Sequence, residues 1–244
     1  MNRIHIQTAA DPTAVGKIAA EIFLSHVRAK PNAVLGLATG STPIPLYRSL
    51  IEANQAKKVS FRGVRTVNLD EYVGLPGTHD QSYRYFMNTN LFDHVDIDKA
   101  NTNVPDGMAG DAEAACNAYE EKIASLGGID VQLLGIGLNG HIGFNEPTNV
   151  FPKRTHIVEL TSSTREANKR FFASIDDVPT QAITMGIGTI MAAKKIMMIA
   201  TGENKAEILK ASLTGEVNPM VPASILQFHP DVTVFADEAA LRLL

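Results

Sequence analysis

The sequence has little cysteine and no long apolar run. Cys116 is the single cysteine among 244 residues, so the chain forms no intramolecular disulfide. A lone cysteine suits a reducing compartment, which predicts a cytoplasmic location. No apolar stretch approaches the roughly 18 residues that a membrane-spanning helix needs. Residues 1–6 contain no apolar core of a signal peptide, and we therefore expect a soluble protein without a membrane partner.

Positive charge is also scarce. Lys and Arg number 22 against 26 Asp and Glu, which gives a formal net charge of −4. A nucleic-acid-binding protein normally carries a basic excess or a clustered basic stripe, and an anionic membrane attracts a polybasic tract. The sequence has neither feature. We therefore expect no nucleic-acid and no membrane partner, while an anionic small substrate stays possible because a local pocket of an acidic protein can be positive.

The motifs of several enzyme classes are missing. The seven histidines include no pair at the i, i+4 spacing of a zinc-binding helix, and one cysteine supplies no thiolate cluster. There is no G-x-S-x-G nucleophile elbow and no phosphate-binding Walker A sequence. We therefore expect neither a catalytic metal nor a redox cofactor.

Short apolar runs alternate with helical patterns along the whole chain. Near-continuous apolar runs are typical of strands buried on both faces, and their alternation with helices predicts a mostly parallel sheet covered on both sides. The expected fold is α/β, a three-layer, Rossmann-like open sheet formed by residues 1–244 as one domain. The expected strands are 3–7, 33–38, 64–69, 131–136, 157–160, 195–200 and 232–236; the expected helices begin with one after Asp11 and continue with 43–55, 81–92, 111–125, 163–172 and 203–213.

Ligands of such sheets bind outside the carboxyl ends of the strands, so the loops that follow strands carry the functional information. Thr39, Gly40, Ser41 and Thr42 follow the second expected strand and precede a helix. Thr42 is expected to cap that helix, and free N–H groups and hydroxyls at a helix start can bind an anion. The pattern alone leaves two interpretations open, a phosphate site or an ordinary capped turn.

A carboxylate follows the third expected strand. Asp70 stands at its carboxyl end, where a carboxylate can reach the cleft and act as a general base. The alternative is that Asp70 and Glu71 are a solvated acidic pair that opens a loop.

The segment after the fourth expected strand is rich in glycine. Gly135, Gly137 and Gly140 match the dinucleotide fingerprint G-x-G-x-x-G, and Glu159 lies at about the distance expected of a ribose-binding acid. That fingerprint requires a helix at its third glycine. Residues 141–153 carry glycine and prolines without a helical apolar stripe, which argues against a dehydrogenase.

The glycines instead allow a tight loop in which His141 and Glu146 meet over the cleft. A carboxylate beside a histidine fixes the tautomer of the ring and raises its basicity, so the pair is a proton-transfer device. Two cations complete the candidate set. Lys205 follows the expected strand 195–200, and Arg170 lies on the expected helix 163–172. Each alone is typical of a solvated surface charge, but a cation at a strand exit can also complete a phosphate clamp.

Several segments together resemble the glucosamine-6-phosphate deaminases over nearly the whole chain. The most specific are Asp-Glu-Tyr-Val-Gly-Leu at 70–75 and Gly-His-Ile-Gly-Phe-Asn-Glu-Pro at 140–147. The others are 35–43, 82–83 with 86–87, 135–137, 163–165 with 167–168 and 170–172, and 222–227.

The resemblance implies conversion of glucosamine-6-phosphate to fructose-6-phosphate and ammonia, in amino-sugar catabolism and without a cofactor. It implies that Asp70 moves a proton between C2 and C1, and that His141, supported by Glu146 and Asn139, opens the sugar ring. The implied catalytic set is Asp70, Asn139, His141 and Glu146, and the implied phosphate-binding set is Thr39, Gly40, Ser41, Thr42, Arg170 and Lys205.

The chain departs from the family pattern in two places. Many members have Asp where this chain has Asn139, and the longer, allosteric members have basic residues where His156 and Val158 stand here and continue past position 244. We therefore expect hyperbolic kinetics, no activation by N-acetylglucosamine-6-phosphate, and activity as a monomer or small homo-oligomer.

Two other functions deserve comparison. A 6-phosphogluconolactonase would share the fold and a similar Gly-His loop, but not the segments 70–75 and 144–147. A sugar-phosphate-sensing regulator would add a helix-turn-helix, for which the ten residues before Asp11 leave no room.

Overall fold

The structure is a computed structural model, and it describes residues 4–160, 165–166, 169, 172 and 174–244. Its centre is a seven-stranded sheet in which neighbouring strands run parallel throughout the described residues. The order across the sheet is β1 (His5–Ala9), β10 (Val232–Asp237), β9 (Lys195–Ala200), β6 (Val131–Leu134), β2 (Val34–Leu37), β3 (Arg65–Asn68) and β5 (Thr102–Asn103).

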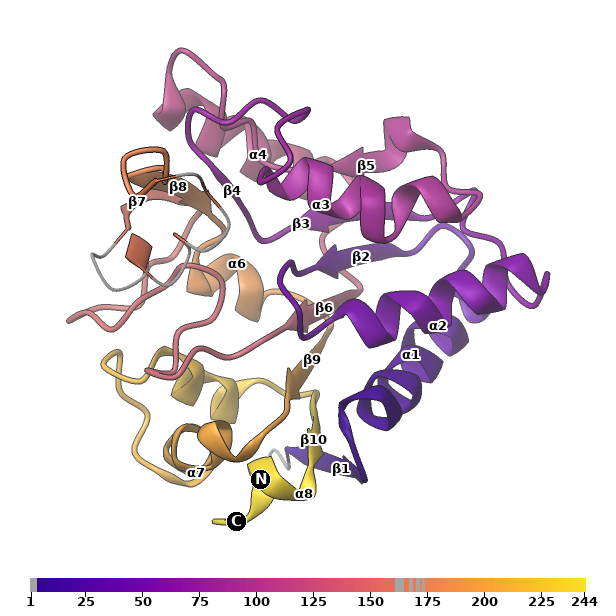
Figure 1. Cartoon of the computed structure of the whole chain (residues 1–244), viewed down its shortest axis with the longest axis vertical. Helices are drawn as coiled ribbons and strands as arrows, with labels where there is room; N and C mark the ends of the chain where they lie inside the picture. The colour runs from indigo at the N-terminus through magenta and orange to yellow at the C-terminus, as the bar shows by residue number, and fades with distance from the viewer. Residues whose placement is uncertain (1–3, 161–164, 167–168, 170–171, 173) are drawn as a thin grey trace.

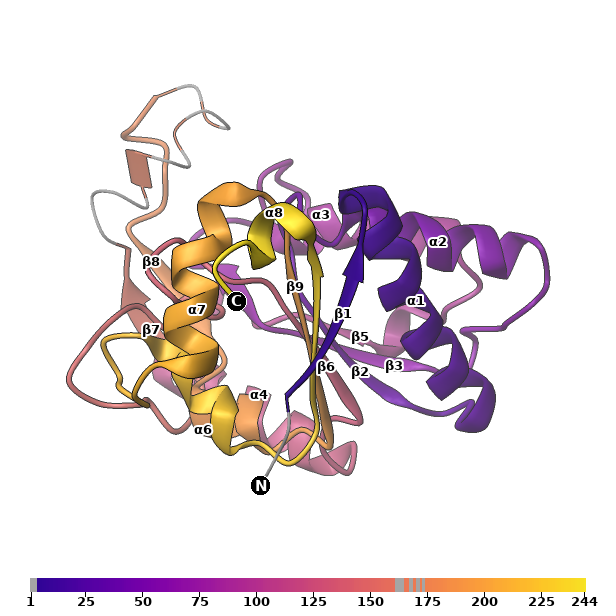
Figure 2. The ribbon, with the colours of Figure 1, turned by 90° about the horizontal axis from the view of Figure 1, so that it is seen from below.

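Helices pack on both faces of this sheet, as the alternation of strands and helices predicted. Figure 2 shows α1 (Pro12–Ala29) and α2 (Ile44–Gln55) on one side and α7 (Ala206–Thr214) on the other. The remaining helical elements are α3 (Tyr83–Asn90), α4 (Ala112–Ser125), α6 (Ile187–Met191), α8 (Glu238–Leu241) and the 3-10 turns η1 (Phe92–His94), η2 (Lys99–Asn101), η4 (Glu203–Lys205) and η5 (Pro222–Phe228). The α/β fold class predicted from the sequence is confirmed.

Helix α1 shows how local sequence fixes an element. The Asp11 side chain accepts a hydrogen bond from the Ala14 N–H at 2.9 Å, and Pro12 occupies the first turn, where its missing N–H costs nothing. Val15, Ala19 and Phe23 are spaced to form one stripe and are fully buried. This stripe seals one face of the sheet.

A second, smaller sheet was not predicted. It consists of β4 (Asp70–Tyr72), β8 (Gln181–Thr184) and β7 (His156–Glu159), paired antiparallel in that order. The expectation that 157–160 joins the parallel sheet is wrong: along β7 exposed residues alternate with half-buried ones, as in a strand with one solvated face. The strand β4 contains two acidic residues, so it has no hydrophobic pattern from which a strand would be predicted.

The direction in which strands are added to the large sheet reverses at β2. From β2 the chain proceeds through β3 to β5 on one side, whereas β6, β9 and β10 follow on the other side. Ligands of open α/β sheets bind at such a reversal, outside the carboxyl ends of the strands. The small sheet stands next to these ends because β4 begins two residues after β3 ends (Figure 1).

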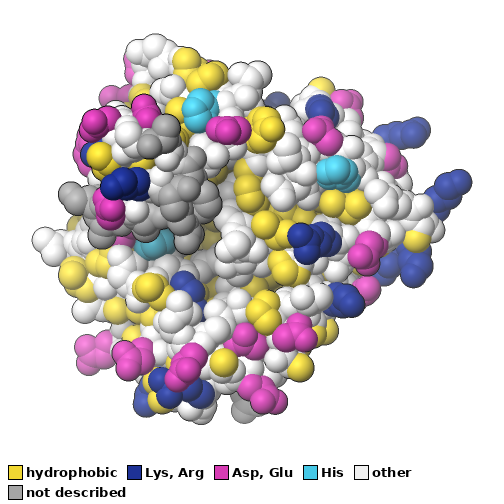
Figure 3. Space-filling model, in the orientation of Figure 1, with side chains coloured by type: hydrophobic (Ala, Val, Ile, Leu, Met, Phe, Trp, Pro, Cys, Tyr) yellow, Lys and Arg dark blue, Asp and Glu magenta, His cyan; other side chains and the backbone are white. Residues whose placement is uncertain are grey.

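The surface carries charges of both signs. On the face shown in Figure 3, Lys and Arg side chains are scattered among Asp and Glu and form no single basic patch. In the described part of the chain, no helix is both long enough and apolar enough to cross a membrane.

Candidate active site

The loop after β2 presents polar groups at the start of α2. Gly40 has a φ of 94°, a conformation that favours glycine, and the neighbouring Ser41 is exposed. The expectation that Thr42 caps the helix is wrong, because α2 begins at Ile44 and its N-cap, Pro43, makes no side-chain hydrogen bond. The Ile44 N–H donates to the carbonyl of Ser41 at 3.3 Å, and Pro45 has no N–H, so the polar groups beside the helix start that suit an anion are those of the loop, among them the hydroxyls of Thr39, Ser41 and Thr42.

Tyr47 fixes the base of this loop. Its hydroxyl donates to the carbonyl of Ala38 at 2.6 Å and accepts from the Ala38 N–H at 3.3 Å, and its side chain is fully buried. The end of β2 is thereby tied to α2. Ala38, the residue before the loop 39–42, is therefore held in place. A binding loop needs such a support if its hydrogen-bond donors are to keep their positions.

Asp70 lies where the large sheet meets the small one. It is the first residue of β4 and is 7% exposed. Burial, and after it the charge of Glu71, raise the pKa of Asp70 from 3.8 to about 8. A Cβ added at Gly143 would lie 3.6 Å from Oδ2 of Asp70, so the loop after β6 runs directly past this carboxyl group.

Glu71 is buried too, and it has a different role. Its carboxylate accepts hydrogen bonds from the backbone N–H groups of Tyr72, Tyr83 and Arg84, each at 2.9 Å, and thereby ties β4 to the start of α3. Burial raises the pKa of Glu71, and the three N–H groups oppose that change. The alternative of a solvated acidic pair is therefore wrong, since Glu71 is 3% exposed.

His141 is held by a chain of two polar side chains. Its Nδ1 lies 2.7 Å from Oδ1 of Asn139, and Nδ2 of Asn139 donates to Oε2 of Glu146 at 2.5 Å. Nδ1 is also 3.5 Å from Oε1 of Glu146. An amide oxygen only accepts, so Nδ1 carries a hydrogen and the neutral ring keeps Nε2 free as a base.

The glycine-rich loop after β6 is tight, as the sequence indicated. The Gly137 N–H donates to the carbonyl of His141 at 2.9 Å, and the Gly140 N–H donates to the carbonyl of Gly137 at 3.1 Å. No helix begins at Gly140, which removes the dinucleotide interpretation. Glu159 accepts from Nε2 of Gln181 at 2.5 Å within the small sheet instead of facing the loop.

Two buried polar residues, to which sequence reasoning assigned no role, secure this loop against the small sheet. Nδ2 of Asn145 donates to the carbonyls of Ile142 and Met185, both at 2.9 Å. Oγ1 of Thr184 accepts from the Phe144 N–H at 3.0 Å. Thr184 is also the partner of Asp70 across β4 and β8. The loop with His141 and the strand with Asp70 are therefore parts of one packed unit.

The two predicted cations have different outcomes. Lys205 lies in η4 after β9, and its Nζ donates to the carbonyl of Ile136 at 2.6 Å, at the start of the β6 loop. Burial lowers the pKa of Lys205. Arg170 lies outside the described residues, as do most positions of the expected helix 163–172.

Aromatic rings enclose the region of Asp70. The Tyr72 ring centroid lies 4.8 Å from that of Tyr83 and 6.0 Å from that of Phe144. The Phe172 ring packs edge-on against Tyr72 at 6.3 Å. These rings belong to a small core separate from the main one. Sequence reasoning missed this cluster because its members come from four distant segments.

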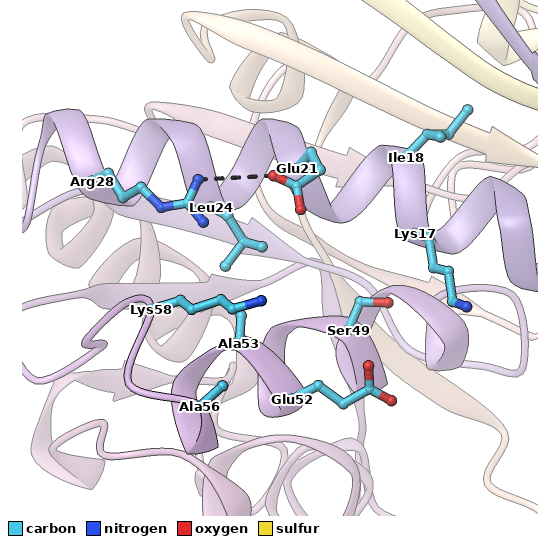
Figure 4. Close-up of a pocket in the computed structure, with 10 residues that line it drawn as sticks. All are labelled: Lys17, Ile18, Glu21, Leu24, Arg28, Ser49, Glu52, Ala53, Ala56 and Lys58. Atoms are coloured by element: carbon cyan, nitrogen blue, oxygen red, sulfur yellow. Dashed lines mark ion pairs between the residues drawn. The ribbon is translucent and has the colours of Figure 1, made fainter.

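Two other hollows lie away from these residues. One, of about 480 Å³, lies between α1 and α2 and has both acidic and basic side chains, with Arg28 and Glu21 forming an ion pair at 3.8 Å (Figure 4). The other, of about 620 Å³, is bordered by Arg84, Thr102 and α4. Neither hollow contains a predicted site residue. The candidate site is therefore identified by the types of residue at the strand ends and not by the size of a cavity.

The comparison with known proteins agrees with this geometry. Residues 9–235 match the family described as glucosamine-6-phosphate isomerases/6-phosphogluconolactonase. The chain belongs to this family. A glucosamine-6-phosphate deaminase of Clostridium perfringens is 55% identical over 230 residues, which cover 94% of this chain and 95% of that protein.

Solved structures of related proteins give the same result. A structure described as a monomeric glucosamine-6-phosphate deaminase has a TM-score of 0.95 and 46% identity, covering 99% of this chain and 100% of that one. A 6-phosphogluconolactonase from Trypanosoma brucei has a TM-score of 0.79 at 20% identity, with full coverage of both chains. The second likeness shows the fold alone. Within the isomerase/lactonase family, this chain is therefore far more similar to the deaminases.

Proposed function

We propose that this protein is a glucosamine-6-phosphate deaminase, a deaminating aldose–ketose isomerase of amino-sugar catabolism. The observation that carries the proposal is the pairing, at one edge of the sheet, of a buried carboxyl group with a held histidine. Asp70 borders the loop that presents His141, through the contact at Gly143, and Asn139 fixes Nδ1 of the ring. The relatives at 46% and 55% identity that are named deaminases support it.

The phosphate of the substrate would be placed first. The exposed Ser41 and the half-buried Thr39 and Thr42 follow the carboxyl end of β2, and Lys205 stands beside the neighbouring β6 loop. A charge-assisted hydrogen bond from an ammonium to a phosphate adds to the N–H donors of a helix start. We assign the phosphate to Thr39, Gly40, Ser41, Thr42 and Lys205, with Arg170 as a further ligand.

Ring opening would then use His141. Its free Nε2 takes the proton of the anomeric hydroxyl as the bond between C1 and the ring oxygen breaks, and it returns that proton to the ring oxygen. The step neither gains nor loses a proton overall. Asn139 keeps Nδ1 protonated throughout, and Glu146, joined to Asn139 at 2.5 Å, stabilises the positive charge that the ring carries during the step.

Isomerisation would use Asp70. Its carboxylate removes the proton from C2, the electron pair forms a C1–C2 double bond, and the proton is delivered to C1. One hydrogen of the amino group moves to O1, so that C2 becomes an imine, and water then hydrolyses the imine to the ketose and ammonia. A carboxylate whose pKa is about 8 is a stronger base than an exposed one, and its pKa lies near working pH, where general-base catalysis is most efficient.

The remaining properties of the protein are proposed with this function. We propose that residues 1–244 act as one domain, on a small sugar phosphate, in the cytoplasm and without a cofactor. The likeness to a deaminase described as monomeric supports activity as a monomer.

A comparison of two substrates tests the proposal. The purified protein is incubated with glucosamine-6-phosphate, and in parallel with 6-phosphogluconolactone, the substrate of the other branch of the family. We expect release of ammonia from the first and no acceleration of lactone hydrolysis. Lactone hydrolysis without ammonia release would contradict the proposal. The variant Asp70→Asn, assayed beside the wild type, controls for contaminating activities because it should lose the ammonia signal.

A further inference from the structure

One glycine of the β6 loop has an unusual neighbour. A Cβ added at Gly137 would lie 2.2 Å from both Nδ1 and Cε1 of His141 and 2.5 Å from its Nε2. The imidazole therefore occupies the place where the side chain of any other residue would begin. Other glycines of the loop differ: Gly140 and Gly143 have φ values of 86° and 60°, whereas Gly137 does not have a positive φ. The backbone conformation at 137 therefore does not require glycine, and the three atoms nearest to an added Cβ all belong to the His141 ring.

Two hydrogen bonds hold the ring beside this position. Asn139 accepts from Nδ1 at 2.7 Å, and the Gly137 N–H donates to the carbonyl of His141 at 2.9 Å. The backbone that forms the wall and the backbone that carries the histidine are therefore joined by a direct hydrogen bond. A methyl group at 137 would have to move the ring, since the wall cannot retreat without breaking that bond.

We propose that Gly137 is a positioning residue for His141: by having no side chain, it lets the imidazole lie within hydrogen-bond reach of Asn139 with Nε2 left for the substrate. The inference rests on the proposed function, in which His141 opens the sugar ring. Ordinary van der Waals contact begins near 3.4 Å, so a Cβ now 2.2 Å from the ring displaces it by about 1 Å. That displacement takes Nδ1 out of line with Oδ1 of Asn139, from which it is now 2.7 Å away, and weakens the hydrogen bond that fixes the ring.

The test is Gly137→Ala, assayed with glucosamine-6-phosphate. A misplacement of about 1 Å at a reacting group costs on the order of 10²-fold in rate, so kcat/KM should fall by about that factor while the thermal midpoint stays close to that of the wild type. Gly110→Ala is the matched control, because Gly110 has no atom within 4 Å of an added Cβ and no positive φ. It should leave kcat/KM unchanged.

A double mutant separates positioning from general damage. In a His141→Ala background, Gly137→Ala should lower kcat/KM by less than about two-fold, because the ring on which it acts is gone. If Gly137→Ala alone does not fold, the double variant should fold, since removal of the ring removes the overlap. An equal loss in both backgrounds, or a single variant as active as the wild type, would overturn the inference.

The tautomer of the ring gives a second readout. In ¹⁵N NMR of the wild type, the His141 signals, identified by their loss in His141→Ala, should show hydrogen on Nδ1, and Gly137→Ala should abolish that preference. An unchanged pattern in Gly137→Ala would contradict the inference. A wild type that releases no ammonia but shows both spectral results would refute the proposed function and leave the positioning intact.

Discussion

Replacing Asp70 by Asn should abolish activity and at the same time stabilise the protein. The substitution keeps the shape of the side chain and removes its charge. In the folded protein the pKa of Asp70 is about 8, against 3.8 for an ordinary aspartate, and the side chain is 7% exposed. Burial therefore disfavours the ionised form of this carboxyl group, which lowers the free energy of unfolding of the wild type. The Asn variant has no ionisable group at this position and does not lose that stability.

The sign follows from proton binding. Between pH 4 and pH 8 the folded wild type keeps a proton on Asp70 that the unfolded chain releases near 3.8. Its free energy of unfolding therefore falls as pH rises through this range, by up to about 1.4 kcal/mol per pH unit. The whole difference amounts to at most about 6 kcal/mol. Asn at this position does not titrate, so the advantage of the variant should grow from pH 4 to pH 8 and stay constant above.

Urea unfolding at several pH values measures the effect, and steady-state assays measure the loss of activity. General-base catalysis contributes about 10² to 10⁴ in rate, so kcat should fall by that factor while the substrate still binds. Asp80→Asn is the matched control, because the side chain of Asp80 is 72% exposed. The reasoning is refuted if the stability difference between wild type and Asp70→Asn is independent of pH, or if the variant keeps more than about a tenth of the activity.

Four further outcomes are expected. The kcat/KM of the wild type should rise with pH to a midpoint near 8, because Asp70 must be ionised to act; a profile flat from pH 6 to 9 would contradict this. Lys205→Ala should raise KM by about 10- to 100-fold with little change in kcat, since a lost charge-assisted hydrogen bond costs about 1.5–3 kcal/mol, and glucosamine without the phosphate should be a very poor substrate. Asn139→Asp sets a second carboxylate where the amide now donates to Glu146 at 2.5 Å, so the pH profile of kcat should gain a step that Glu146→Gln removes; a profile identical to that of the wild type would show that the amide is irrelevant. Rate curves should be hyperbolic and insensitive to N-acetylglucosamine-6-phosphate, because positions 156 and 158 lack the basic residues of allosteric relatives; a sigmoidal curve that this sugar straightens would mean that another surface binds it.

The central strands of the large sheet were predictable because they are buried on both faces, whereas the two-residue edge strand β5 was not predicted. In β9 each residue after Lys195 is apolar and buried, and such a run stands out in a sequence. The small sheet was not, because its pairing is non-local: β4 pairs with β8, more than a hundred residues away, over three residues that include Asp70 and Glu71. No local pattern encodes a contact of that separation.

The candidate site was predictable as a set of residue types and not as a geometry. The strand-end rule placed Asp70, His141 and Lys205 at the same sheet edge, as the structure has them. The burial that raises the pKa of Asp70 arises where β4 meets β8 and the loop after β6, and the opening for the imidazole comes from the absence of a side chain at Gly137. Both depend on three-dimensional packing, which local spacing does not reveal.

The most direct test of the account is the stoichiometry of the reaction. Ammonia and fructose-6-phosphate are measured together over time as the wild-type protein consumes glucosamine-6-phosphate. A proton transfer from C2 to C1 followed by imine hydrolysis predicts that the two products appear in equal amounts and that Asp70→Asn loses both together. Ammonia accompanied by an aldose phosphate, or a ketose phosphate that keeps its nitrogen, would contradict the account.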